Sequence, residues 1–171
     1  MSHRAKKTLC LALGNDILGD DGVSFAVARI IENQFDDVDV IMSSEAGLAL
    51  LELIEGYENA LLLDAIKTGT VPAGTILAFS PEDFQKVIAP SPHYAGLPEV
   101  LALAERLEIP MPHDLRILAM EVKDPYVIQE GLTEDVEKNL PAFVESTCRI
   151  LTGWVTGASA CHTPQTEAHH A

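Results

Sequence analysis

The feature that most constrains this chain is a short apolar run that ends in a carboxylate. The residues from Ala60 to Leu63 are all apolar, and Asp64 follows them directly. Neighbouring residues of a strand point to opposite faces of a sheet, so a strand without polar positions is buried on both faces. Sheets buried in this way are mostly parallel and are covered by helices on both sides. We therefore expect a central strand with Asp64 at its carboxyl end.

The remaining hydrophobic pattern alternates between short strands and helices. Apolar runs predict strands at Thr8–Leu13, Val38–Met42, Ala60–Leu63, Thr75–Phe79 and Leu115–Val122. Helical spacing predicts helices at residues 22–35, 47–57, 98–107 and 136–154, with a short helical turn at 81–87. This order predicts an α/β fold: a three-layer α/β/α sandwich with a mostly parallel, roughly five-stranded twisted sheet. Residues 1–154 are expected to form a single domain, and residues 155–171 a disordered C-terminal tail.

Composition limits the classes of partner. The 171 residues carry a formal net charge of -15, which would repel a phosphate backbone, so we expect no nucleic-acid partner. The three cysteines (Cys10, Cys148 and Cys161) form no Cys-x-x-Cys pair, which argues against a disulfide framework and a thiolate zinc site. Because no stretch approaches the roughly 18 apolar residues of a membrane span, we expect no membrane segment. We also expect the protein to be cytoplasmic and to be a monomer.

Three polar positions are expected to meet at one edge of this sheet. The first is the loop Gly14–Gly22 with Asp20 and Asp21, the second is Asp64, and the third is His93 in a proline-rich loop. Open α/β sheets bind ligands at the carboxyl ends of their strands. Two carboxylates and one imidazole suit zinc, nickel, iron or manganese, and three protein ligands leave coordination positions open. Asp21, Asp64 and His93 are therefore the candidate metal ligands.

Each of these positions also has a purely structural explanation. Aspartate is a favoured N-cap, so Asp20 or Asp21 can cap the helix that follows; we assign the cap to Asp20 and the functional role to Asp21. Backbone N–H groups of the next turn can satisfy Asp64. A single histidine such as His93 is more often a surface residue than a ligand. The case for a site rests on the convergence of all three.

Other chemistries are not supported by the motifs. The loop Gly14–Gly22 has neither Gly-x-Gly-x-x-Gly nor the lysine of a P-loop, and its carboxylates would repel the phosphates of a nucleotide. The sequence has no Gly-x-Ser-x-Gly elbow, and Cys10 lies inside a predicted strand. A serine or cysteine nucleophile is therefore not expected.

Several of these residues also belong to ordered motifs of a known family. The motifs are Gly14-Asn15 followed by Asp20-Asp21-Gly22, then Leu62-Leu63-Asp64-Ala65, Ser91-Pro92-His93, and the stretch Met120–Tyr126. In order and spacing they resemble the nickel-iron hydrogenase maturation endopeptidases, over about residues 9–154. Members of that family remove a short C-terminal peptide from a hydrogenase large subunit once nickel has been inserted. The family's three metal-contacting positions fall on Asp21, Asp64 and His93.

The resemblance implies an endopeptidase whose partner is the precursor of a hydrogenase large subunit. The same three residues would be catalytic and metal-binding, with nickel supplied by the substrate or, alternatively, another divalent metal as cofactor. The chain departs from the family at Ala12 and Ser24, where glycine is usual, and at Ser43–Gly47, which replaces a Gly-Gly-Thr-like turn and adds the carboxylate of Glu45. These departures bear on which precursor is served.

Two other functions fit the same ligand set. A nickel-handling chaperone would bind metal and partner without cutting the chain. A metal-dependent hydrolase on the same common fold would turn over a small ester, amide or glycoside, because a fold does not fix a function.

Overall fold

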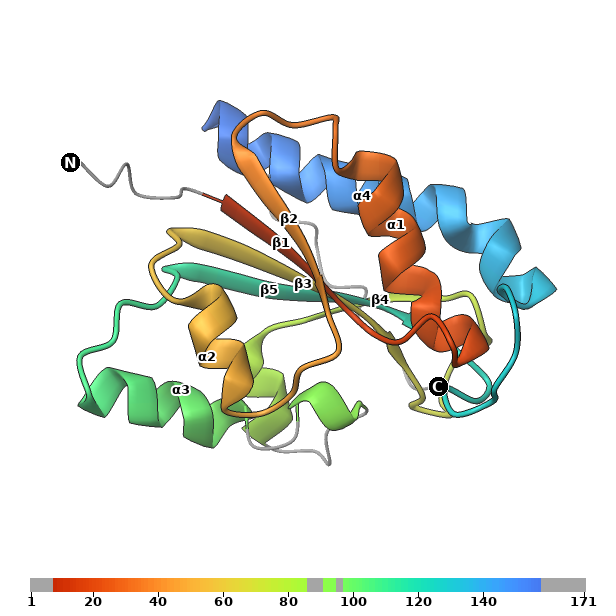
Figure 1. Ribbon diagram of the computed structural model, residues 1–171, viewed down its shortest axis with the longest axis horizontal. Coiled ribbons are helices and arrows are strands. Elements are labelled where there is room, and N and C mark those ends of the chain that lie inside the picture. The colour runs from red at the N-terminus through yellow and green to blue at the C-terminus, as the bar shows by residue number, and fades with distance from the viewer. Residues whose placement is uncertain (1–7, 86–90, 95–96, 158–171) are drawn as a thin grey trace, which may run out of the picture.

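A five-stranded sheet with helices on both faces organises the residues that the computed structural model describes, which are 8–85, 91–94 and 97–157 (Figure 1). The strands are β1 (Thr8–Leu13), β2 (Val38–Ser43), β3 (Asn59–Ile66), β4 (Ile76–Phe79) and β5 (Asp114–Glu121). The helices are α1 (Val23–Ile31), α2 (Ala49–Ile54), α3 (Leu97–Arg106) and α4 (Glu134–Thr156). Three short 3-10 turns are η1 (Gly19–Gly22), η2 (Pro81–Gln85) and η3 (Pro92–Tyr94).

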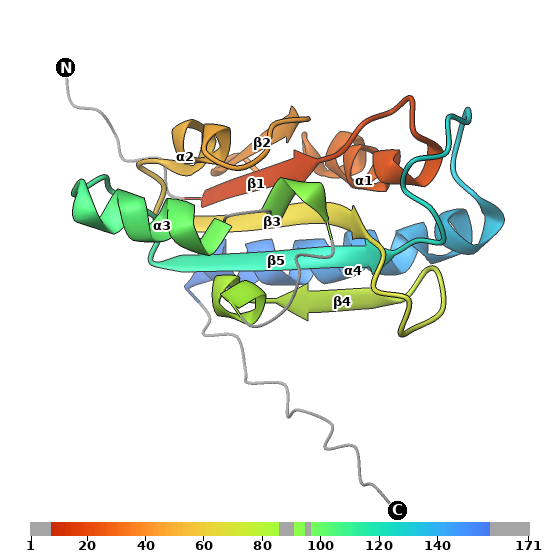
Figure 2. The same cartoon turned by 90° about the horizontal axis from the view of Figure 1, so that it is seen from below.

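The strand order is β2-β1-β3-β5-β4, which confirms the predicted mostly parallel α/β sheet. β2, β1, β3 and β5 are parallel, and only β4 runs antiparallel, along β5, as the arrows of Figure 2 show. β1 and β3 are neighbours in space although α1, β2 and α2 separate them in sequence, and Ala12 of β1 pairs with Leu63 of β3. The loops that follow these two strands therefore start side by side.

The predicted three layers are present. α1 and α4 cover one face of the sheet, and α2 and α3 cover the other (Figure 1). Along β1, Cys10 and Ala12 belong to the core under α1 and α4, whereas Leu9 and Leu11 belong to the core under α2 and α3. Each fully buried leucine stabilises the fold by about 2 kcal/mol relative to an exposed one. This two-sided burial is why residues 9–13 of the strand are all apolar.

The central strand is longer than the sequence predicted. β3 continues to Ile66, and its ladder with β5 is unbroken through the pair Ile66–Glu121. Asp64 therefore lies within the strand rather than at its end, and its side chain is fully buried. The prediction ended the strand where the polar residue begins, but backbone pairing with a parallel neighbour does not depend on the polarity of the side chain.

Two helices are shorter than predicted and one is longer. α1 ends at Ile31 rather than at residue 35, and α2 ends at Ile54 because Glu55 adopts an extended conformation. α4 continues through Thr156 and stops at Gly157, whose φ of 67° is the left-handed conformation that ends many helices. The predicted boundary after residue 154 was therefore placed too early, and the rest of the predicted tail, from residue 158, lies outside the described residues. Among the described helices, none has the length and apolar composition needed to cross a membrane.

Candidate functional site

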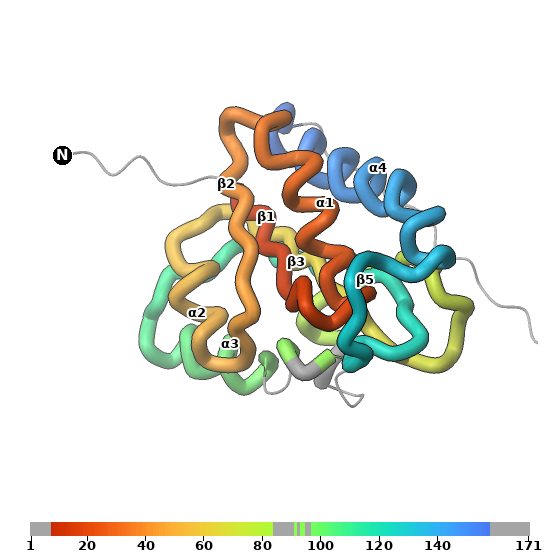
Figure 3. Tube along the Cα trace, turned by 45° about the vertical axis from the view of Figure 1, so that its right-hand side comes forward, coloured from red at the N-terminus to blue at the C-terminus, as the bar shows by residue number. Residues whose placement is uncertain are grey.

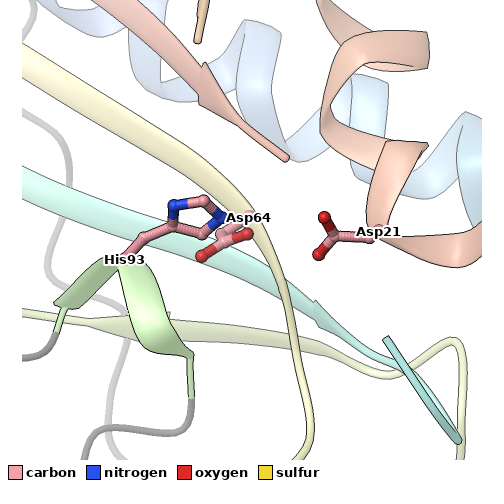
Figure 4. Close-up of side chains that lie close together, drawn as sticks. All are labelled: Asp21, Asp64 and His93. Carbon is pink, nitrogen blue, oxygen red and sulfur yellow. The ribbon is translucent and has the colours of Figure 1, made fainter. Parts of the chain in front are cut away.

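The three predicted ligands come from three separate elements at the carboxyl edge of the sheet. Asp21 lies in η1, Asp64 in β3 and His93 in η3, and Figure 4 shows their side chains gathered in one place. One ligand atom from each residue lies within 4.8 Å of the other two. Their exposed fractions are only 9%, 0% and 8%. The convergence expected from the sequence is present in the structure.

Close backbone packing positions Asp21. Gly14 directly follows β1. A Cβ atom at this position would overlap the carbonyl oxygen of Asp21, so only glycine fits. Next to it, the buried hydroxyl of Ser24 donates a hydrogen bond to the carbonyl of Leu13. Ser24 therefore ties the start of α1 to the end of β1. Burial raises the pKa of the Asp21 carboxyl, although nearby His93 and the amide of Asn15 partly offset this.

Asp20 has a different role from the one predicted. The residue that precedes α1 is Gly22, and no side chain caps the helix there. Instead, the Asp20 carboxylate accepts two hydrogen bonds from Thr133, at 2.7 Å from its amide and 2.7 Å from its hydroxyl. The prediction of an N-cap was wrong because the partner lies 113 residues away, at the start of α4, where no local pattern indicates it.

Asp64 is held by hydroxyl groups of the loop that carries His93. Ser91 Oγ donates to Asp64 Oδ2 at 2.6 Å, and the amide of Ala65 donates to Oδ1 at 2.8 Å. The Tyr94 hydroxyl hydrogen-bonds to the same carboxyl group. Complete burial nevertheless raises the pKa of Asp64 well above its usual range, because the hydrogen bonds offset only part of the desolvation. A carboxylate with a raised pKa is a stronger base than an exposed one.

A backbone carbonyl fixes the tautomer of His93. Its Nδ1 lies 2.9 Å from the carbonyl oxygen of Glu45, and a carbonyl oxygen can only accept a hydrogen bond. Nδ1 therefore carries the proton, and Nε2 keeps the lone pair that can bind a metal. The amide of Gly47 donates to the carbonyl of His93 at 3.4 Å, so the segment after β2 supports the loop twice.

A small pocket of about 150 Å³ opens beside these residues. Asp21 and His93 contribute to its wall, whereas Asp64 is fully buried. The other lining residues come from the loops after β1, β2 and β5, from β3 and from the residue before η3: Gly14, Asn15, Leu18, Ser44, Ala65, Ser91, Pro125 and Tyr126. The site is therefore open on one side and closed by the sheet on the other.

The donor set fits a divalent transition metal. Bonds of about 2.0–2.2 Å place two ligands of one ion at most about 4.4 Å apart, so a set within 4.8 Å needs to close by only a few tenths of an ångström. The imidazole presents its unprotonated nitrogen, and the open pocket leaves room for ligands from another molecule. These three side chains can thus complete the coordination of an ion that is already partly ligated.

Sequence reasoning missed several residues that build the site. Ser91 was noted only as part of a motif, and nothing indicated that its hydroxyl reaches Asp64 or that the carbonyl of Glu45 reaches His93. Contacts made by backbone atoms leave no trace in residue type. Cys10, which the sequence placed inside a strand, is fully buried in β1, and burial raises the pKa of its thiol to about 12.

The chain is similar in sequence to proteins of hydrogenase formation. A family model described as hydrogenase maturation protease matches residues 26–150. The hydrogenase expression/formation protein HupD of Rhizobium leguminosarum bv. viciae is 25% identical over 162 residues, which cover 91% of this chain and 79% of that protein. HupD of Bradyrhizobium diazoefficiens is 23% identical over 172 residues, which cover 98% of this chain and 89% of that protein.

Solved structures have the same fold. The hydrogenase maturating endopeptidase HybD from E. coli superimposes with a TM-score of 0.70 at 25% identity, covering 85% of this chain and 92% of its own. The NiFe hydrogenase maturation protease HybD from Thermococcus kodakarensis gives a TM-score of 0.65 at 24% identity, covering 84% of this chain and 98% of its own.

Proposed function

The chain belongs to the hydrogenase maturation protease family, and we propose that Asp21, Asp64 and His93 are the residues with which it removes a C-terminal peptide from a nickel-loaded hydrogenase large-subunit precursor. The observation that carries this assignment is the convergence of the three side chains, within 4.8 Å, at the carboxyl edge of the sheet. Three ligands from three separate elements form an open site.

The nickel of the precursor serves as the recognition tag in this proposal. His93 offers Nε2, because Glu45 holds the proton on Nδ1, and each aspartate offers a carboxylate oxygen. A precursor that already holds nickel brings the ion with most of its ligands in place and needs only outer ligands from the protease. Binding at this point fixes the scissile bond beside the site, and correct placement of reacting groups accounts for a large part of catalysis.

Asp21 is the residue that we assign as general base. It lines the pocket, and burial raises its pKa, which suits a group that must take a proton near neutral pH. Asp21 accepts a proton from a water molecule as the water oxygen attacks the scissile carbonyl carbon. The carbon–nitrogen bond then breaks, and the proton passes from Asp21 to the departing amine. Nickel bound to the substrate supplies Lewis acidity during this reaction.

The two alternative functions are less well supported. The pocket of about 150 Å³ is smaller than the ~300–1,000 Å³ of ordinary small-molecule sites, which argues against a hydrolase of small esters or glycosides. A chaperone that binds without cutting is not favoured either, because the matching family is described as a protease.

The test compares two forms of one substrate. The purified protein is mixed with nickel-loaded precursor and, separately, with nickel-free precursor, and the released C-terminal peptide is followed by mass spectrometry. We expect cleavage of the loaded form only, together with weak binding of free nickel by the isolated protein. Equal cleavage of both forms would contradict the role of nickel as the tag, and tight binding of the loaded form without cleavage would favour the chaperone.

A further inference from the structure

Three consecutive large apolar side chains are exposed in the segment that follows β5. The exposed fractions are 66% for Tyr126, 45% for Val127 and 79% for Ile128. Isolated exposed apolar residues are common, but a run of three in a soluble fold is unfavourable unless it contacts another molecule. Polar residues at these three positions would avoid the exposure of apolar surface to water and would leave the core unchanged.

The backbone of this segment is held in place rather than free to fold its side chains inward. Gln129 donates its amide hydrogen to the carbonyl of Ile17 at 3.3 Å, and Leu18 and Gln129 form a parallel bridge. At Gly19, an added Cβ would lie 3.4 Å from the carbonyl oxygen of Val127, so the segment packs directly on the turn before Asp21. Figure 3 shows the loop after β1 beside the loop after β5. This anchoring keeps Val127 and Ile128 exposed.

The exposed run adjoins the pocket of the proposed active site. Tyr126 belongs to both, because it lines the pocket and remains 66% exposed. Ile17, which accepts the hydrogen bond from Gln129, is itself 66% exposed. Together, Ile17 and Tyr126–Ile128 form an apolar surface on the loops after β1 and β5, which we call the apolar rim.

We propose that the apolar rim is the docking surface for an apolar segment of the large-subunit precursor next to its scissile bond. The pocket holds about 150 Å³, enough for the reacting groups but far too little to bind a folded protein, whose stable complexes bury on the order of 1,600 Å². Most of the binding surface must therefore lie outside the pocket. The rim is apolar, ordered and continuous with it. The inference rests on the proposed function.

The charge around the rim adds to the description of the occupant. The exposed carboxylates of Asp124 and Glu130 flank the run, and the whole chain carries a net charge of -15. Basic residues beside the apolar ones of the precursor segment would be attracted to these carboxylates, chiefly speeding association.

The test uses Ile128→Ser in the full-length protein with nickel-loaded precursor. Ile128 is the most exposed residue of the run and does not line the pocket, so its replacement leaves the catalytic groups in place. Loss of one buried isoleucine contact is expected to raise KM by about tenfold with little change in kcat. Leu107→Ser is the matched control, since Leu107 is 60% exposed and follows α3, and its KM should not change. Ile128→Leu keeps an apolar side chain at this position and should have the same KM as the unsubstituted protein.

The outcomes separate this inference from the proposed function. If the unsubstituted protein fails to cut the precursor, the proposed function fails and the docking surface fails with it. If it cuts the precursor and Ile128→Ser has the same KM, the function stands and the rim is not the docking surface. If sedimentation shows that Ile128→Ser converts a dimer to a monomer without changing KM, the rim is an interface between two copies of this chain, which also overturns the inference.

Discussion

Two buried carboxylates lie near the carboxyl ends of neighbouring parallel strands, and their surroundings differ. Glu121 of β5 is 2% exposed and is surrounded by donors from one loop: the amides of Thr68 and Gly69, at 2.8–3.1 Å, and the Thr68 hydroxyl at 2.7 Å. Asp64 of β3 is fully buried, accepts its hydrogen bonds from Ser91, Ala65 and Tyr94, and also faces Asp21 and His93.

The difference separates a structural acid from one suited to chemistry. The donors around Glu121 stabilise its charge and fasten the loop that begins with Thr68 to the end of β5, so this acid supports the fold. Asp64 also has three donors, but they do not offset its complete burial, and burial raises its pKa well above the usual range. A second carboxylate nearby adds to that rise. Burial and the number of donors therefore do not distinguish the two acids; the second carboxylate and the imidazole beside Asp64 do.

The largest expected effect is the loss of activity in Asp64→Asn. The amide keeps the shape of the carboxyl but loses its charge and one of the oxygens offered to the nickel of the precursor, and we expect precursor cleavage to fall by at least about a thousandfold. The fold should persist, because the Ser91 hydroxyl can accept a hydrogen bond from the new amide group. Cleavage assayed by mass spectrometry, with circular dichroism on the same sample, checks both. If the variant is unfolded, Asp64 supports the fold, as Glu121 does, and the contrast between the two acids disappears.

Asp64→Asn should also change how the stability of the protein depends on pH. In the folded protein the pKa of Asp64 lies above its ordinary value of 3.8, so above pH 3.8 the folded state binds more protons than the unfolded state. The contribution of Asp64 to the free energy of unfolding therefore decreases as pH rises from 3.8 toward the folded pKa. Asp64→Asn lacks this contribution, so its relative stability should increase over that range. Urea unfolding at several pH values measures the difference, and a constant difference would contradict the raised pKa.

Glu121→Gln should affect stability rather than activity. Its amide nitrogen would face an N–H or O–H group that now donates to an oxygen, and a buried donor without an acceptor costs about 2 kcal/mol. We expect this decrease in the free energy of unfolding, with cleavage per folded molecule retained. The decrease is measured by urea unfolding and the cleavage rate well below the melting temperature. Loss of cleavage in a folded variant would place Glu121 in the site and remove the distinction from Asp64.

The smallest expected effect distinguishes the donors of the two acids. Ser91→Ala removes the hydroxyl at 2.6 Å from Asp64, which should lower kcat about tenfold because the carboxylate is no longer held in position. Thr68→Val is the matched control, because it removes the hydroxyl that donates a hydrogen bond to Glu121. This variant should lower the melting temperature and leave kcat unchanged. Equal effects of both variants on kcat would show that the two loops are not functionally different.

Much of the site could be predicted from the sequence because its acids interrupt apolar patterns. Asp64 follows a run that is buried on both faces, and Asp21 follows a strand that ends in Gly14, so both were expected at one edge. Of the two adjacent acids, Asp21 lies beside Asp64 and His93, whereas the predicted cap at Asp20 was wrong, since Asp20 binds Thr133. Which of two adjacent acids turns toward the site depends on where α4 begins, and that is not a local property.

The sequence by itself determined the α/β class, the two-sided burial of the central strands and the edge at which the polar residues lie. These follow from periodicity, which is a local property of the chain. Only the tertiary structure decided that β1 and β3 are neighbours, that β4 is antiparallel, and that the carbonyl of Glu45 orients His93. Strand order and backbone contacts depend on which distant segments pack together, and a backbone carbonyl is chemically the same at every residue. Residue type therefore predicted the groups of the site, and packing determined how they are held.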